Sequence, residues 1–252
     1  MIFDLQKASL LKRFSAFLLD LIVIAIAITG FSALFSMLFG YDAHEQALRD
    51  VYDRYEAEYN ISFDLTSEEY LALSEDEKAI FDKAYEAMNK DENALYTYNM
   101  VIRLNLTVTS LAIIVSFLIF EFLIPMWLKN GQTIGKKIFG IAVMREDGVR
   151  ISTFQLFVRS ILGKFTIETM IPFLTLFLVF FGSLGLTGTV IASLIACVQV
   201  ALLFKGKRCV IHDLLARTVA VDMASQMIFD TTEDMIAYKK RVSAEKAANQ
   251  TY

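Results

Sequence analysis

Four stretches of the chain are almost entirely apolar, and polar segments separate them. They cover residues 14–39, 104–128, 165–181 and 188–204. A helix needs about 20 residues to cross a hydrocarbon core about 30 Å thick, because each residue rises by about 1.5 Å. The first two stretches meet this length. The last two are short, so we expect a locally thin bilayer or snorkelling ends there. The pattern predicts an all-α polytopic membrane protein with four transmembrane helices.

The alternation of apolar and polar segments divides the chain into six parts. The first apolar stretch is too long for a cleaved signal and is not followed by a small-residue cleavage site, so we expect it to be an anchor. The parts are an amino-terminal segment with the first helix (1–40), an acidic insert (41–100), the second helix (101–128), a basic loop (129–164), the third and fourth helices (165–204) and a carboxy-terminal segment with a charged tail (205–252).

The acidic insert has the pattern of amphipathic helices. Apolar residues recur at spacings of three and four in both of its halves. Thr66 followed by Glu69, and Ser74 followed by Glu77, have the spacing of capping boxes, which begin helices. We therefore expect an outer helical hairpin over residues 41–100.

The polar segments on the other side of the helices contain short strand patterns. Residues 141–144 and 149–152 flank Asp147-Gly148, a dipeptide typical of hairpin turns. Residues 218–221 are a further strand candidate. Each segment follows a helix that returns to the same side, so we expect the strands to form one small cytoplasmic β element, with 143 near 219. The tail from 230 to 252 is expected to be a charged helix.

Charge is distributed unevenly between these segments. The chain is 56% hydrophobic with a net charge of −4. Residues 41–98 hold 16 acidic and 5 basic residues, whereas residues 129–164 hold 7 basic and 2 acidic ones. Basic loops favour the cytoplasmic side. This predicts a multi-pass protein of the inner or plasma membrane with both termini in the cytoplasm and the acidic insert outside.

Several classes of function have no support in the residues. The chain lacks a Ser/His/Asp arrangement, metal-ligand spacing and a dinucleotide fingerprint, and its histidines are His44 and His212 alone. Cys197 and Cys209 match no metal or redox spacing, so we expect free thiols. We expect no enzyme, no cofactor and no nucleic-acid partner.

A glycine-rich run with two lysines opens the basic loop. It lacks the spacing of a nucleotide P-loop, and no strand precedes it. Lysines at a membrane boundary attract anionic headgroups by about 1 kcal/mol per charge. We therefore predict a lipid-interface motif made of Gly131, Thr133, Gly135, Lys136 and Lys137.

Charged residues occur inside or at the ends of the apolar stretches. Asp20 lies in the first and Arg13 directly before it. The two are seven residues apart and so project from one helix face about 10 Å apart along the axis. A charge at a helix centre costs about 2.5–3.5 kcal/mol, so partners are expected. Arg13 is expected to pair with Asp213, and Arg159 with Asp20 or Asp213.

Two glutamates add to this polar set. Glu121 lies in the second stretch, and Glu168 lies four residues before Pro172. A proline removes a backbone donor, so the helix is expected to open near Glu168. Broken helices beside carboxylates bind cations in membranes, although both glutamates have the alternative of snorkelling to the inner face. The candidate ion-coupling cluster is Arg13, Asp20, Asp213, Glu121, Glu168 and Arg159.

These motifs together resemble the RDD family, which is named for one arginine and two aspartates. The resemblance rests on Arg13 with Asp20, the run 131–140, Asp147-Gly148, Arg159 and the segment 212–216. By position, the family's three named residues correspond to Arg13, Asp20 and Asp213. Members are linked to cation/proton exchange and to accessory roles beside other membrane proteins.

The resemblance implies two alternative functions. In the first, the chain is a small proton-coupled transporter of a monovalent cation. Its carriers are then Asp20 with Glu121 or Glu168, with Arg13 as the counter-charge, and it acts as a homo-oligomer because four helices are few for a translocation path. In the second, it is a non-transporting accessory subunit that binds another membrane protein, and the Arg/Asp/Asp cluster is structural.

Overall fold

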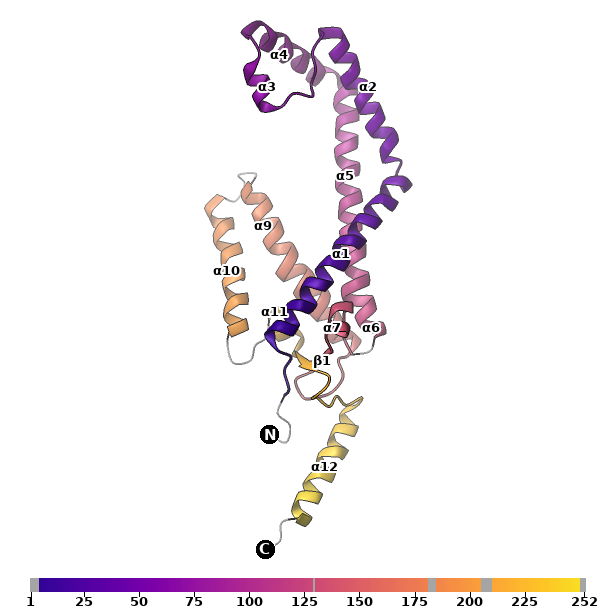
Figure 1. Cartoon of the computed structure of the whole chain (residues 1–252), viewed down its shortest axis with the longest axis vertical. Coiled ribbons are helices and arrows are strands. Elements are labelled where there is room, and N and C mark those ends of the chain that lie inside the picture. Colours follow the sequence, from indigo (N-terminus) through magenta and orange to yellow (C-terminus); the bar gives the residue numbers. More distant parts are fainter. Residues whose placement is uncertain (1–4, 129, 181–184, 205–209, 250–252) are drawn as a thin grey trace. The chain divides into compact units, whose positions relative to one another are not determined.

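The computed structural model describes residues 5–128, 130–180, 185–204 and 210–249, drawn in colour in Figure 1. The chain forms two compact units. One consists of Met1–Ala25 with Ser116–Tyr252, and the other of Ile26–Val115. Two long helices contribute residues to both units: α1 (Leu10–Leu38) and α5 (Glu92–Leu118).

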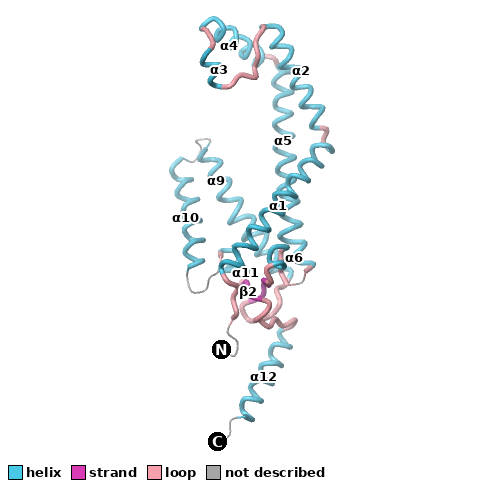
Figure 2. Tube along the Cα trace, viewed as in Figure 1, coloured by secondary structure: helices cyan, strands magenta, loops and turns pink. Residues whose placement is uncertain are grey.

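Two helices of the described chain are long and apolar enough to cross a membrane. One is α1, and the other is the continuous helix Glu92–Trp127, which contains α5, a π-helical segment η1 (Ile119–Leu123) and α6 (Ile124–Trp127). A third apolar helix, Thr189–Leu202, is shorter than this length and lies within α10 (Gly185–Phe204). The two apolar helices α10 and α9 (Ile171–Phe180) pack against each other, as the tube in Figure 2 shows.

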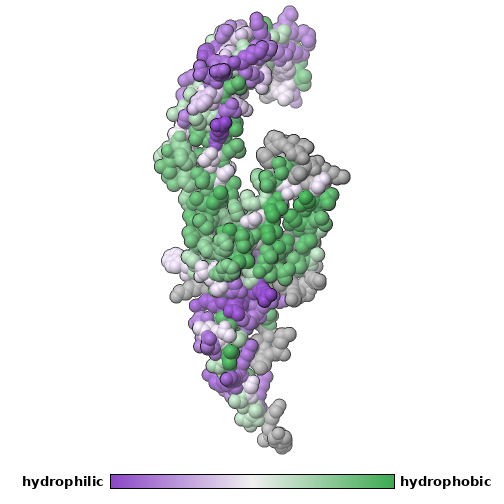
Figure 3. Space-filling view, turned by 180° about the vertical axis from the view of Figure 1, so that it is seen from behind, coloured by the Kyte–Doolittle hydropathy of each residue, from purple (hydrophilic) through white to green (hydrophobic). Residues whose placement is uncertain are grey.

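Large apolar side chains cover the outer surface of α1. None of its apolar window is buried within the protein, and Leu11, Phe14, Ile22 and Ile26 are exposed. Figure 3 shows hydrophobic side chains, in green, over the long helices, and hydrophilic ones, in purple, where the strands and short helices gather. A surface of this kind is unfavourable in water but fits a lipid environment.

The second unit contains three helices that match the acidic insert. They are α2 (Tyr41–Tyr59), α3 (Ser67–Ala72) and α4 (Glu75–Lys90). Both predicted capping boxes are confirmed, because the Thr66 and Ser74 side chains accept from the backbone N–H of Glu69 and Glu77, and each glutamate accepts in return. The insert is therefore helical as predicted, but it has three helices where a hairpin was expected.

The helix after the insert begins at Glu92 rather than near residue 101. Asp91 accounts for this start, since its carboxylate accepts from the backbone N–H of Asn93 at 2.8 Å. The same carboxylate accepts from the Tyr55 hydroxyl at 3.0 Å and pairs with Arg54 at 2.6 Å. An acidic group at a helix start also complements the helix dipole. The polar sequence 92–100 is thus helical because Asp91 caps it and joins it to α2.

A small antiparallel sheet lies in the first unit. It consists of β1 (Ile141–Arg145) and β2 (Thr218–Asp222). The predicted pairing of these segments is confirmed, with a register that places Val143 opposite Ala220. Both strands are largely buried, and Ala142, Val143, Met144 and Val221 are fully covered.

The expected hairpin partner of β1 does not form a strand. Residues 149–152 make isolated bridges only, Met144 to Arg150 and Val149 to Phe229. The turn at Asp147-Gly148 does form, with Gly148 at φ +95°. The chain then leaves the sheet because Ser152 caps the next helix, α8 (Thr153–Phe157), through a capping box with Gln155.

Four further elements complete the first unit. They are α7 (Ile134–Ile138), the π-helical segment η2 (Val158–Met170), α11 (Ile211–Ala216) and α12 (Thr232–Asn249). The charged carboxy-terminal helix is therefore confirmed as α12. Cys197 is a free thiol, whereas Cys209 lies outside the described residues.

Candidate functional site

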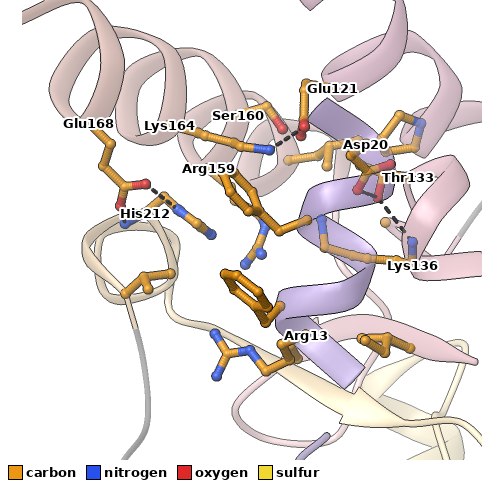
Figure 4. A pocket seen from close by; sticks show the side chains of 18 of the residues that line it. Arg13, Asp20, Glu121, Thr133, Lys136, Arg159, Ser160, Lys164, Glu168 and His212 are labelled. Atoms are coloured by element: carbon orange, nitrogen blue, oxygen red, sulfur yellow. Dashed lines mark hydrogen bonds and ion pairs between the residues drawn. The ribbon is translucent and has the colours of Figure 1, made fainter. Parts of the chain in front are cut away.

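A cavity of about 500 Å³ lies within the first unit, between the short helices and the ends of the long ones. Its wall is formed by α1, η1, α7, η2, α11 and the sheet. Figure 4 shows that charged side chains from these elements converge on it. The charged lining residues are Arg13, Lys136, Arg159 and Lys164, with Asp20, Glu121 and Glu168.

Asp213 does not line the cavity itself but binds two of its lining residues, Arg159 and Arg13. Its side chain is 1% exposed and forms an ion pair with Arg159. The same carboxylate accepts from Arg13 at 3.4 Å and from the Thr218 hydroxyl at 3.1 Å. Arg159 also donates to the Thr218 hydroxyl at 2.8 Å. The network joins α1, η2, α11 and β2 and includes the predicted pairs of Asp213 with both arginines.

Asp20 has a different partner from those that the sequence suggested. Its carboxylate accepts from the Thr133 hydroxyl at 2.5 Å and from the backbone N–H of Gly135 at 2.7 Å. Thr133 is itself the N-cap of α7. A carboxylate at a helix start satisfies amide donors that have no partner within the helix. Asp20 therefore fixes α7 to α1, and the alternative pair of Arg159 with Asp20 is not formed.

Close backbone packing explains why a glycine follows this cap. A Cβ built on Gly135 would overlap the backbone carbonyl oxygen of Ala16 in α1. Ala16 is itself 1% exposed. The first turn of α7 thus approaches α1 as closely as two backbones can, and Asp20 lies one helical turn beyond that contact.

Two π-helical segments, η1 and η2, supply much of the remaining wall. Each ends just before a helix that contains one of the chain's two prolines, Pro125 and Pro172. A proline has no N–H for the residue four positions earlier, and its ring clashes with that carbonyl. Those residues are Glu121 and Glu168. The helix opening that Pro172 predicted near Glu168 is present as η2. Pro125 has the same relation to η1, which the sequence analysis did not predict.

Glu121 and Lys164 form an ion pair between the two π-helical segments. Glu121 is 3% exposed, and Lys164 is 19% exposed. A π turn widens the helix locally and is common at functional sites. Here it brings a carboxylate from η1 and an ammonium from η2 together on the cavity wall (Figure 4).

Glu168 joins η2 to α11. Its carboxylate accepts from the His212 backbone N–H at 2.7 Å and lies 2.7 Å from His212 Nδ1. The two elements are close here because Gly163 has no side chain, and a Cβ on it would lie 2.6 Å from His212 Cβ. Burial, aided by the positive charge of Arg159, lowers the pKa of His212 to about 3. His212 is therefore neutral and donates from Nδ1 to Glu168.

This lowered pKa predicts a pH-dependent stability. Unfolded His212 has a pKa of about 6.5, so below that pH the unfolded state binds a proton that the folded state excludes. Stability from His212 is complete above pH 6.5 and falls as the pH drops towards 3. From pH 7.5 to 5.0 the expected loss is roughly 2 kcal/mol. Thermal unfolding midpoints of wild type and His212→Gln at both pH values test this: the variant should lose less. An equal decrease in both proteins would contradict it.

The two lysines of the predicted lipid-interface motif point in different directions. Lys137 is exposed, whereas Lys136 lines the cavity. Gly131, also in this motif, has φ +59° and lies against Val143 and Ile151. The run therefore forms a structural support for the cavity, and Lys137 is exposed outside it.

The structure gathers the six residues of the predicted cluster in or directly behind one cavity wall. Sequence reasoning missed Lys164, His212 and the role of Thr133. Apart from its position five residues after Arg159, nothing in the sequence marks Lys164 as a site residue, because its partner Glu121 is distant in the chain. Among the described residues, no three His, Cys, Asp or Glu side chains are arranged to hold a metal ion.

Comparison with known proteins assigns the chain to a family. No curated protein and no solved structure matches it significantly. The model of the RDD family matches residues 7–217, which is most of the chain and includes Arg13, Asp20 and Asp213. The chain therefore belongs to the RDD family and is a membrane protein with long apolar helices.

Proposed function

We propose that this RDD-family protein is a proton-coupled transporter of a monovalent cation, with Glu121 as the coupling carboxylate. The observation that carries the proposal is the Glu121–Lys164 ion pair on the cavity wall between two π-helical segments. An ionisable residue within a membrane helix is by default a functional candidate, because keeping it there is costly.

The arrangement of partners favours Glu121 over the aspartates. Asp20 holds a hydroxyl and a backbone N–H, and Asp213 holds two guanidinium groups and a hydroxyl. Backbone and guanidinium donors are geometrically fixed. The partner of Glu121 is the ammonium of Lys164, a point charge on a flexible stem, which an incoming cation is able to displace.

The proposed cycle uses one carboxylate for two competing ligands. A monovalent cation enters the cavity, replaces the Lys164 ammonium at Glu121 and is later displaced when a proton binds the same carboxylate. Cation and proton then occupy Glu121 in turn, which is the requirement for exchange. Arg13 contributes to the charge balance through its pair with Asp213.

The proposal includes a topology and an assembly. In this proposal the end of η2 together with α9 forms the third span, and α10 forms the fourth. The excess of basic residues in the loops supports a cytoplasmic location of both termini. Four helices are few for a complete path, so the transporter is a homo-oligomer. We assign it no enzymatic activity, no cofactor and no nucleic-acid partner.

Flux in sealed proteoliposomes tests this function. An internal pH dye should report proton movement when Na⁺, K⁺ or Li⁺ is added outside wild-type protein. Glu121→Gln is expected to abolish the cation-dependent signal, because a neutral amide holds neither a cation nor an exchangeable proton. Glu146→Gln, an exposed glutamate in the β1 turn, is the matched control and should transport as wild type does.

A folding control separates lost transport from lost structure. Glu121→Gln leaves the Lys164 ammonium without its carboxylate, whereas the pair Glu121→Gln with Lys164→Gln removes both charges. Both variants are compared with wild type by gel filtration and thermal unfolding. Absence of flux from inserted wild type, or unchanged flux in a well-folded Glu121→Gln variant, would overturn the proposal.

A second candidate function is favoured by the Asp213 and Asp20 contacts. All three named residues of the family are engaged in holding α1 to α7 and α11, so they require no transported ion. This fits an accessory subunit that binds another membrane protein, in which the cluster is structural. Such a subunit would show no flux with any cation, and Glu121→Gln would alter stability or partner recovery only.

A further inference from the structure

Lys136 differs from the other basic residues of the cavity. Arg13 and Arg159 pair with Asp213, and Lys164 pairs with Glu121. Within the described part of the chain, the Lys136 ammonium has no ion pair and no hydrogen bond, although its side chain lines the cavity. Figure 4 shows this side chain extending from α7 towards Arg159.

The carboxylates around Lys136 are committed to other donors. Glu121 of η1 holds Lys164, and Asp20 of α1 holds Thr133 and Gly135. Lys164 and Arg159 of η2 add like charge to this region, and His212 of α11 is neutral. The surroundings of the Lys136 ammonium therefore lack a carboxylate in contact and include two further cations.

Lys136 nevertheless carries its charge near neutral pH. Burial lowers its pKa to about 8, with the charges of Lys164 and Arg159 adding to the effect and those of Glu121 and Asp20 opposing it. At pH 7 most of the ammonium remains protonated. A charge removed from water is costly unless it is paired, so this site favours an anion.

The wall beside Lys136 identifies the class of anion. Leu10, Phe14 and Phe17 of α1 line the same cavity, and Phe14 and Phe17 are 58% and 47% exposed. An ammonium within an apolar wall suits an amphiphile that has an acidic head and a hydrocarbon part. The cavity volume of about 500 Å³ is within the range of small-molecule sites and holds a headgroup with its phosphate.

We propose that Lys136 binds the phosphate group of an anionic ligand inside this cavity, with an anionic phospholipid as its source. The phosphate oxygens accept from the Lys136 ammonium, and Arg159 and Lys164 strengthen the local positive potential. The hydrocarbon part lies along Phe14 and Phe17. The proposal concerns binding alone and does not depend on whether the protein transports a cation.

Binding to purified protein in neutral detergent tests this site. Native mass spectrometry and thermal unfolding are used with three probes: phosphatidylglycerol, a monoacylglycerol without phosphate, and inorganic phosphate. Lys137→Gln, an exposed neighbour on the same helix, is the matched control for Lys136→Gln. Wild type and Lys137→Gln should bind phosphatidylglycerol equally, and Lys136→Gln should bind it about tenfold more weakly or less, as expected for a lost charge-assisted hydrogen bond.

The probes distinguish the sources of the phosphate. Lys136-dependent binding of phosphatidylglycerol alone supports the phospholipid, and Lys136-dependent binding of inorganic phosphate alone supports the phosphate site with a soluble ligand. Equal binding by wild type and Lys136→Gln, equal weakening in both lysine variants, or equal binding of the monoacylglycerol would overturn the proposal.

A measurement on wild type covers the case in which Lys136→Gln does not fold. An amine-reactive reagent is applied with and without phosphatidylglycerol, and peptide mass spectrometry follows Lys136 and Lys137 separately. The lipid should protect Lys136 more than Lys137. Equal labelling of Lys136 with and without the lipid would contradict the site.

Discussion

Asp213→Asn is expected to destabilise the protein by about 3–5 kcal/mol, the range for breaking a buried ion pair from one side. The substitution leaves Arg159, which is 5% exposed, without its carboxylate, and it weakens the contact to Arg13. The loss arises because the buried Arg159 guanidinium no longer has the Asp213 carboxylate as its ion-pair partner. Thermal or chemical unfolding in detergent measures it.

Asp230→Asn is the matched control for Asp213→Asn. Asp230 pairs with Arg150 at 2.8 Å, but its side chain is 68% exposed. Exposed pairs contribute at most about 1 kcal/mol, so this change should be nearly neutral. The double variant Asp213→Asn with Arg159→Gln should recover part of the loss because both charges are gone. A loss for Asp213→Asn as small as for the control would refute the central role of this network.

Gly135→Ala is expected to have the second large effect, a loss of about 1–3 kcal/mol or more. The added methyl overlaps the carbonyl oxygen of Ala16, and neither backbone is able to move without separating α7 from α1. The same movement lengthens the bond from the Gly135 N–H to Asp20. Unfolding midpoints and the yield of monodisperse protein report the effect.

Gly30→Ala is the control for Gly135→Ala, because the same substitution at residue 30 is not expected to lower stability. Apart from the neighbouring backbone of α1 itself, no atom lies within 4 Å of a Cβ built on Gly30, which is in the interior of that helix. Alanine is favoured over glycine in a helix by about 1 kcal/mol, so stability should be unchanged or raised. If Gly135→Ala were as well tolerated as Gly30→Ala, the close contact of α7 with α1 would be wrong.

Asp213→Asn and Gly135→Ala together test whether the family's named residues have a structural role. Asp213 and Asp20 connect the short helices α11 and α7 to α1 through direct side-chain contacts. If both variants behave as expected, the Arg/Asp/Asp set is a structural frame for the cavity. The chemistry then depends on the side chains that line the cavity within that frame, above all Glu121, Lys164 and Lys136.

The sequence by itself determined the features that depend on local pattern. Apolar length identified the long helices, and capping spacing located the starts of α3 and α4. Strand patterns identified β1 and β2, because buried strands are short apolar runs rich in β-branched residues and bounded by turn residues. The pair of Arg13 with Asp213 was also predicted from sequence, whereas Arg159 had two predicted partners, Asp20 and Asp213, of which the structure shows Asp213.

Only the tertiary structure decided which polar groups meet across the cavity. Asp20 binds Thr133 and Gly135 because α7 folds back against α1, and no local pattern encodes that distance. Lys136 and Lys137 are adjacent in sequence, yet one lines the cavity and the other is exposed, because successive residues of a helix point about 100° apart. The π-helical geometry that joins Glu121 to Lys164 likewise arises from packing around two prolines. Local sequence thus determines the elements, whereas contacts between residues distant in the chain determine the site.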